Sequence, residues 1–288
     1  GESEWQTIFI PWFWMPEYRR KPSPYFVATP EEYELAQKYN LDDSQLCFRR
    51  AKLDELGGTD LFAQEYPANI LESFLTSGRC FVEAPTLNQA EGNCYTADFK
   101  GDFSGGQLVE RTHGNYQEWQ PPSREESFVI GVDVAEGLAY GDYSCAQVLD
   151  SKGNQVACWH GHIDPFDYGA MLCSIAKRFN DAYVIVERNN HGLTTLRKMQ
   201  DMGYQNLFIE SSVDGAYGDR LTKRGGFLTT SKTKPLIIDN LANLLRQGES
   251  GVADIELLSE LRTYIIDDKG AFNSQSGCYD DRVMAYAI

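Results

Sequence analysis

The sequence predicts an α/β protein in which a mixed β-sheet is flanked by helices. Three apolar, β-branched runs separated by polar or glycine-containing turns lie within residues 128–161. Further apolar runs then alternate with segments whose apolar residues recur at helical spacing, up to the end of the chain. Leading strands followed by alternating strands and helices are typical of a sheet with helices on its faces. The 288 residues suffice for one large domain or two ordinary ones.

The first 85 residues predict a small and mostly helical subdomain. An aromatic and β-branched run at 5–13 predicts a strand. Thr29-Pro-Glu-Glu32 combines a capping box with proline at the first helical position, so a helix should run from there to about residue 39. Two more helices are expected, one at about 41–56 before a Gly-Gly pair and one around 70–75.

Residues 86–126 are rich in Gly, Asn, Gln, Ser and Thr and end in a Pro-Pro pair, which predicts a linker with short strands. We therefore expect three parts, the helical subdomain at 1–85, the linker at 86–126 and a second domain at 127–288. After its three leading strands, this second domain should contain helices at 164–179, 193–202, 233–245, 255–261 and from 280 onward, and strands at 183–187 and 206–210.

Acidic residues lie at the ends of several of these elements. Asp133 ends the first strand of the second domain, Glu187 ends the strand at 183–187, and Asp280-Asp281 opens the last helix. Because an acid on a core element is costly to bury unless it is paired or bound to metal, we expect these carboxylates to meet in one site. Hard divalent cations such as Mg²⁺ take oxygen ligands, so the sequence predicts a site for them.

These motifs, in this order, resemble the ribonuclease H-like nuclease domain of the large terminase subunit, the DNA-packaging motor protein of tailed bacteriophages. The resemblance spans residues 128–288 and implies a ribonuclease H-like fold. It also implies a metal-dependent endonuclease that cuts concatemeric double-stranded DNA. The matching phrases are Gly131-Val-Asp-Val-Ala-Glu-Gly137, Gly141-Asp-Tyr-Ser144, Val186-Glu-Arg-Asn-Asn-His-Gly192 and Gly277-Cys-Tyr-Asp-Asp-Arg-Val-Met-Ala285.

The resemblance implies hydrolysis with two Mg²⁺ or Mn²⁺ ions, which activate water and stabilise the leaving oxygen. Asp133 would bridge both ions, Glu187 would bind one and Asp281 the other. Either member of the Asp280-Asp281 pair could contribute, and we favour Asp281 because the apolar residues after it set the buried face of the helix. Asp142 matches the auxiliary acid of the family and could be an outer ligand, or could merely cap its turn.

The N-terminal region resembles the end of the terminase motor ATPase domain and its lid, on phrases such as Pro11-Trp-Phe13, Pro16-Glu-Tyr-Arg19 and Gln64-Glu-Tyr-Pro67. The phosphate-binding loop of the family should then lie upstream. The sequence contains no Gly-x-x-x-x-Gly-Lys-Ser/Thr motif, so this chain alone is not expected to hydrolyse ATP. We expect the sequence to be a fragment; because it stops at Ile288 inside a helical pattern, its C-terminal end could be missing as well.

The partners implied by the resemblance are double-stranded viral DNA, the terminase small subunit, the portal protein and further copies of the chain, in the cytoplasm of the host cell. The net charge of −16 argues against broad DNA binding through a basic face. No apolar run approaches the length of a membrane span, and the seven scattered cysteines predict neither a disulfide framework nor a zinc site. The basic residues that could contact DNA phosphates, or could merely be solvated surface, are Arg188, Lys223, Arg224, Lys232 and Lys234.

Two other functions remain open from the sequence. An actin-like or sugar-kinase ATPase shares the ribonuclease H-like core and a Gly-x-Asp strand end followed by glycines. It should also have a second such hairpin and a glycine-rich adenosine motif; we find neither, and Glu187 has no place in it. The other alternative is a non-catalytic packaging or docking module in which the acids are structural.

Overall fold

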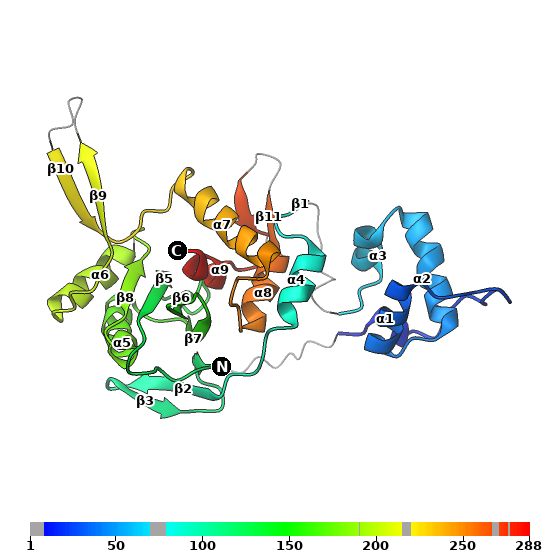
Figure 1. The fold of residues 1–288 in the computed structure, drawn as a ribbon, viewed down its shortest axis with the longest axis horizontal. Helices are drawn as coiled ribbons and strands as arrows, with labels where there is room; N and C mark the ends of the chain where they lie inside the picture. Colours follow the sequence, from blue (N-terminus) through cyan, green and yellow to red (C-terminus); the bar gives the residue numbers. More distant parts are fainter. Residues whose placement is uncertain (1–8, 70–78, 190, 215–219, 267–270, 276) are drawn as a thin grey trace. The chain divides into compact units, whose positions relative to one another are not determined.

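The computed structural model describes residues 9–69, 79–189, 191–214, 220–266, 271–275 and 277–288. The chain divides into two compact units, Gly1–Ser77 and Gly78–Ile288. The second unit holds the sheet and its covering helices (Figure 1). Within the described residues, no helix is both long and apolar enough to cross a membrane.

The first unit is helical, as expected. It contains the 3₁₀-helix η1 (Trp12–Trp14) and the helices α1 (Pro30–Tyr39), α2 (Asp43–Leu56) and α3 (Thr59–Glu65). The capping box of α1 is confirmed, because Thr29 and Glu32 exchange hydrogen bonds between side chain and backbone. The strand expected at 5–13 is wrong in its described part, where aromatic packing of Trp12 between Phe48 and Phe62 accompanies a 3₁₀-turn. The helix expected at 70–75 lies outside the described residues.

A mixed seven-stranded sheet forms the centre of the second unit, in the order β3-β2-β4-β7-β6-β5-β8. Strands β5 and β8 run parallel, and the other neighbours in this sheet run antiparallel. The strands are β2 (Phe99–Ser104), β3 (Gln107–Glu110), β4 (Tyr116–Glu118), β5 (Phe128–Asp133), β6 (Ser144–Asp150), β7 (Gln155–Gly161) and β8 (Tyr183–Val186).

Helices cover both faces of the sheet, as expected for the predicted fold class (Figure 1). Helices α5 (Pro165–Arg178) and α6 (Gly192–Asp201) share one hydrophobic core with apolar residues of β5, β6, β7 and β8. A second core joins the remaining helices, of which α9 lies against β5 and β6. These helices are α4 (Ala84–Glu91), α7 (Thr233–Gln247), α8 (Ile255–Arg262) and α9 (Asp281–Ala287).

Residues 86–126, expected to form a linker with short strands, contain β2, β3 and β4, and all three strands join the main sheet. Strand β4 pairs with β7, and Glu118 at its end forms a buried ion pair with Arg178 of α5 at 2.7 Å. The roles expected for the parts 1–85, 86–126 and 127–288 stay predictions. The other strands form two small sheets and are β1 (Arg79–Cys80), β9 (Ile209–Asp214), β10 (Arg220–Gly225), β11 (Tyr264–Ile266) and β12 (Phe272–Ser274).

Candidate functional site

Acidic residues that are far apart in the sequence meet where β5, β8 and α9 come together. Asp133 is the last residue of β5, Glu187 follows β8, and Asp281 is the first residue of α9. The Glu187 amide donates a 2.8 Å hydrogen bond to the Val132 carbonyl, which places these two strand ends side by side. The fold therefore brings the three predicted acids to one edge of the sheet.

Two glycines allow this close approach. A Cβ atom at Gly131 would lie 2.1 Å from the carbonyl oxygen of Ala285, so only glycine lets α9 pack this tightly on β5. A Cβ atom at Gly192 would lie 1.8 Å from the carbonyl oxygen of Glu187. The turn after β8 therefore also requires glycine, and in it Asn189 donates a 2.7 Å hydrogen bond to the Glu187 carboxylate.

The acids are close enough to perturb one another strongly. Burial raises the pKa of Asp133 well above its ordinary value, and the adjoining carboxyl of Glu187 and the charges of Asp281 and Asp280 raise it further. Burial also raises the pKa of Asp281 to about 7, with Asp280 and then Asp142 as the next causes. A cluster of like charges whose pKa values are raised is typical of a functional site. Asp133 and Asp281 are the perturbed members of this acidic cluster, and Glu187, Asp280 and Asp142 belong to it as the neighbours that act on them.

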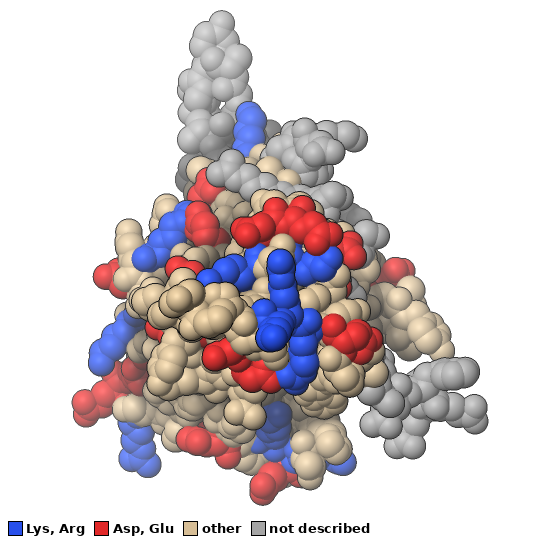
Figure 2. Space-filling view, turned by 90° about the vertical axis from the view of Figure 1, so that its right-hand side faces the viewer, with Lys and Arg blue, Asp and Glu red and all other residues tan. Residues whose placement is uncertain are grey.

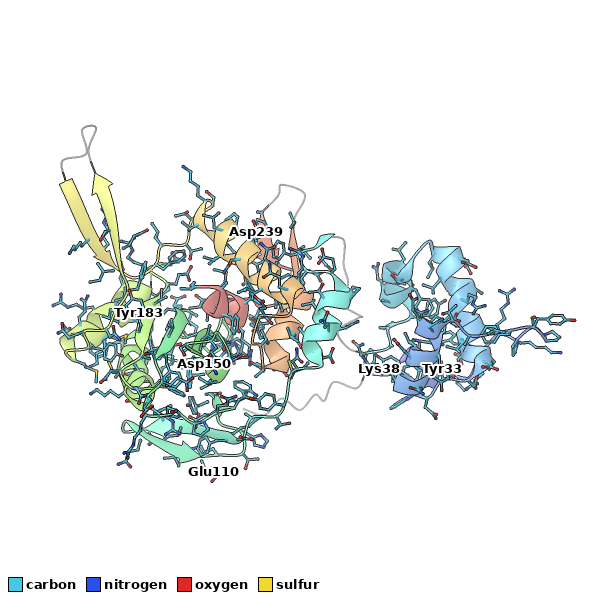
Figure 3. All side chains as sticks on the ribbon, in the orientation of Figure 1. Tyr33, Lys38, Glu110, Asp150, Tyr183 and Asp239 are labelled. Atoms are coloured by element: carbon cyan, nitrogen blue, oxygen red, sulfur yellow. The ribbon has the colours of Figure 1, made fainter. Side chains whose placement is uncertain are left out.

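Asp150 shows how this fold holds a carboxylate that has a structural role. Asp150, at the far end of β6, is labelled in Figure 3. Its carboxylate accepts 2.8 Å hydrogen bonds from the amides of Lys152 and Asn154 and from the Asn154 side chain. Burial alone would raise its pKa, but these hydrogen bonds lower the pKa below the ordinary value. The hydrogen bonds to Asp150 thus outweigh its burial, whereas burial and neighbouring acids prevail at Asp133 and Asp281.

The cluster contains buried atoms that the described residues leave without partners. Asp281 is 5% exposed, and its Oδ2 atom has no hydrogen-bond partner there. The same holds for His160 Nε2, which lies 3.9 Å from that oxygen. Burial, followed by repulsion from Arg282, lowers the pKa of His160 to about 3, so this imidazole is neutral at neutral pH. A buried carboxylate oxygen without a hydrogen-bond partner is suited to bind a cation.

The donor set suits a hard divalent cation, since carboxylate oxygens are its preferred ligands. Within the part of the chain that the structure describes, however, no three His, Cys, Asp or Glu side chains are already arranged to hold a metal ion. Asp133 at present adjoins Glu187, and Asp280 lies 3.4 Å from Lys234 Nζ. Binding would therefore require these side chains to turn toward the ion.

The predicted basic residues do not form one surface. Arg188 pairs with Glu210 at 2.7 Å and is almost buried, and Lys234 pairs with Asp280. Lys223 and Arg224 on β10 and Lys232 before α7 are exposed. On the face shown in Figure 2, basic and acidic side chains are interspersed rather than separated.

The sequence analysis missed two groups beside the cluster. The ring of Tyr143 stacks on His160 and His162, with ring centroids 4.5 and 4.0 Å apart. Glu260 accepts hydrogen bonds from the backbone at the start of α9. Both contacts join different elements of the fold, so no motif within one element predicts them.

Comparison with known proteins identifies the fold. No protein-family model matches the chain, and no curated protein matches it. It is similar to crystal structures of the large terminase nuclease from thermophilic phage G20c, one with bound magnesium and one with bound cobalt. The sequence identities are 18% and 19%, both TM-scores are 0.52, and each match covers 74% of this chain and 96% of that chain. At this identity the likeness concerns the fold, and the second unit therefore has the ribonuclease H-like fold of these nuclease structures.

Proposed function

We propose that this chain contains the nuclease of a viral DNA-packaging terminase, a divalent-metal-dependent endonuclease that cuts concatemeric double-stranded DNA. The observation that carries the proposal is the meeting of Asp133, Glu187 and Asp281 at one edge of a ribonuclease H-like sheet. Similar structures of a terminase nuclease were determined with magnesium and with cobalt, which supports a divalent ion as the cofactor.

Asp133, Glu187 and Asp281 would hold two Mg²⁺ or Mn²⁺ ions, with Asp280 and Asp142 as further oxygen donors. When bound, the ions supply an activated water and neutralise charge on the phosphate. Asn189 orients Glu187 through its 2.7 Å hydrogen bond. Carboxyl groups must be deprotonated to bind ions, so binding should release the protons that the raised pKa values of Asp133 and Asp281 retain.

Cleavage of supercoiled plasmid DNA tests the proposal. We expect the protein to convert the plasmid to nicked and linear forms with Mg²⁺ or Mn²⁺, and to leave it intact with EDTA. The reason is that the ions, and not the side chains alone, supply the nucleophile and the charge neutralisation. Intact plasmid in both metals, with a protein that is folded by circular dichroism, would contradict the proposal.

The docking-module alternative gives a different result in calorimetry. A module whose acids are structural would bind no divalent ion, whereas a nuclease should bind Mn²⁺ and lose that binding in Asp281→Ala. ATP turnover by this chain would instead favour the actin-like alternative. The partners of the proposed nuclease are viral DNA, the terminase small subunit, the portal protein and other copies of the chain, in the host cytoplasm.

The exposed basic residues should contribute to DNA affinity through phosphate contacts. We expect simultaneous replacement of Lys223, Arg224 and Lys232 by glutamine to weaken DNA binding and to reduce the slope of log affinity against log salt by about one for each lost contact. Fluorescence anisotropy with labelled duplex DNA measures this slope, in an Asp133→Asn background that prevents cutting.

The matched control replaces three exposed lysines on other elements, Lys100, Lys152 and Lys177, by glutamine. It removes the same charge from the chain, so it separates specific phosphate contacts from the overall charge. If both triple variants change the slope equally, the assignment of Lys223, Arg224 and Lys232 to the DNA interface is wrong.

A further inference from the structure

Helix α9 begins without the cap that its own sequence offers. Asp280 occupies the N-cap position, where an aspartate usually accepts a hydrogen bond from the second or third amide of the helix. The Asp280 side chain makes no such bond, and its Oδ2 atom lies 3.4 Å from Lys234 Nζ. The first amides of α9 must therefore find another acceptor.

Glu260, the sixth residue of α8, supplies that acceptor. Its Oε2 atom accepts hydrogen bonds from the amides of Arg282 at 2.8 Å and Val283 at 3.2 Å. Its Oε1 atom accepts a 3.1 Å hydrogen bond from the Arg282 guanidinium. The Glu260 side chain is only 10% exposed, so these charge-assisted bonds are shielded from water.

Further contacts link Glu260 and its partner Arg282 to the start of α8 and to β7. Arg282 Nε also lies 3.3 Å from Asp254, the residue that caps α8 through the amide of Glu256. Gln155 of β7 accepts hydrogen bonds from the amides of Ala253 and Asp254, at 2.9 and 2.8 Å. The start of α9 is thus fixed to α8, and α8 is fixed to the first residue of β7, at the end of that strand away from the cluster.

We propose that Glu260 is a positioning residue of the metal centre, which caps α9 in place of Asp280 and so keeps the Asp280 carboxylate off the helix, where it can exchange its contact with Lys234 for a divalent ion beside Asp281. This inference rests on the proposed function. Without Glu260, Asp280 is the nearest carboxylate able to satisfy the amides of Arg282 and Val283. Its side chain would then turn onto the helix and away from the cluster.

Mn²⁺ binding, measured by calorimetry, tests this role separately from activity. Glu260→Ala should weaken Mn²⁺ binding by about tenfold to a hundredfold, the usual effect of losing an outer group that orients a ligand. Glu260→Gln keeps an oxygen that can accept from both amides, so its affinity should stay close to wild type although the charge is lost. A structural role as the partner of Arg282 predicts the opposite, that both variants lose stability and neither loses affinity.

A double-mutant cycle identifies Asp280 as the residue that moves. Asp280→Asn should weaken Mn²⁺ binding in the wild-type protein and have little further effect in Glu260→Ala, where that carboxylate has already left the cluster. Additive effects of the two substitutions would overturn this account. Should Glu260→Ala not fold, Glu260→Met fills the volume of the lost side chain with an apolar one and leaves Arg282 paired with Asp254. That protein also lacks the cap, so it should show the same loss of affinity.

Three outcomes separate the possible failures. A folded Glu260→Ala or Glu260→Met protein that binds Mn²⁺ as tightly as wild type overturns the positioning role and leaves the proposed nuclease standing. An equal loss of affinity in Glu260→Gln and Glu260→Ala also overturns it, because charge and not capping would then decide. A wild-type protein that binds no Mn²⁺ overturns the proposed function and this inference together.

Discussion

Asp133→Asn is expected to slow divalent-ion-dependent cutting of plasmid DNA by about a thousandfold or more. Charge stabilisation by bound ions contributes several kcal/mol to such reactions, and each 1.36 kcal/mol is a factor of ten in rate. Asp133 lies against Glu187 and near both Asp280 and Asp281, so it has the central place in the cluster. The measurement is the single-turnover rate of nicking with Mg²⁺, with enzyme in excess over plasmid.

The matched control for this substitution is Asp150→Asn. Asp150 is also a strand-end acid of the β5–β6 pair, but it lies opposite Phe128, at the end of that pair away from Asp133. Its carboxylate is held by Lys152 and Asn154, so its loss should cost about 1–3 kcal/mol of stability. The rate per folded molecule should not change. Undiminished cutting by Asp133→Asn would place the catalytic site elsewhere.

The acids of the cluster could be predicted because each is marked by a local pattern. Asp133 and Glu187 directly follow short β-branched runs, and such runs form buried strands whose ends meet when the strands are neighbours. Asp281 opens a helix whose apolar residues face the sheet. The fold class followed from the same periodicity, because three leading strands and then alternating elements leave few arrangements.

Contacts made across the fold could not be predicted in this way. The pairing of β4 with β7 makes 116–118 part of the sheet, although the composition around it is typical of a linker. The sequence offered Arg188 as a candidate phosphate contact or a solvated residue, and it gave no sign of the partner on β9, Glu210, that forms an ion pair with it. The cap of α9 comes from Glu260, because the preceding helix happens to place a carboxylate there. Sequence patterns report each element's own burial and capping, and not the partner that tertiary packing supplies.

Without metal, the protein should become less stable as the pH rises toward 7, and Asp281→Asn should remove part of this loss. Burial and the neighbouring acids raise the pKa of Asp281 from 3.8 to about 7 in the folded state. Between these values the folded protein keeps a proton that the unfolded chain releases, so the unfolding free energy falls with increasing pH. The stabilisation from the neutral carboxyl is fully present below about pH 4 and is lost as the pH rises through about 7.

At pH 8 in EDTA, Asp281→Asn should therefore be more stable than wild type, by roughly 2–4 kcal/mol, since each unit of pKa shift corresponds to 1.36 kcal/mol. Urea unfolding of both proteins at pH 5 and pH 8 measures the effect. The difference between the two proteins is informative because carboxyls such as Asp150, whose pKa is lowered, act in the opposite direction and cancel in the comparison.

The stabilities of wild type and Asp281→Asn in Mn²⁺ show whether Asp281 binds an ion or has only a structural role. Ions that bind the folded state raise its stability by mass action, so Mn²⁺ at pH 8 should stabilise wild type strongly and Asp281→Asn weakly. The order of stabilities should then reverse, with Asp281→Asn the more stable protein in EDTA and wild type the more stable one in Mn²⁺. A structural Asp281 would instead make the variant less stable in both conditions, because the substitution would remove a needed carboxylate and leave nothing for the ion to restore.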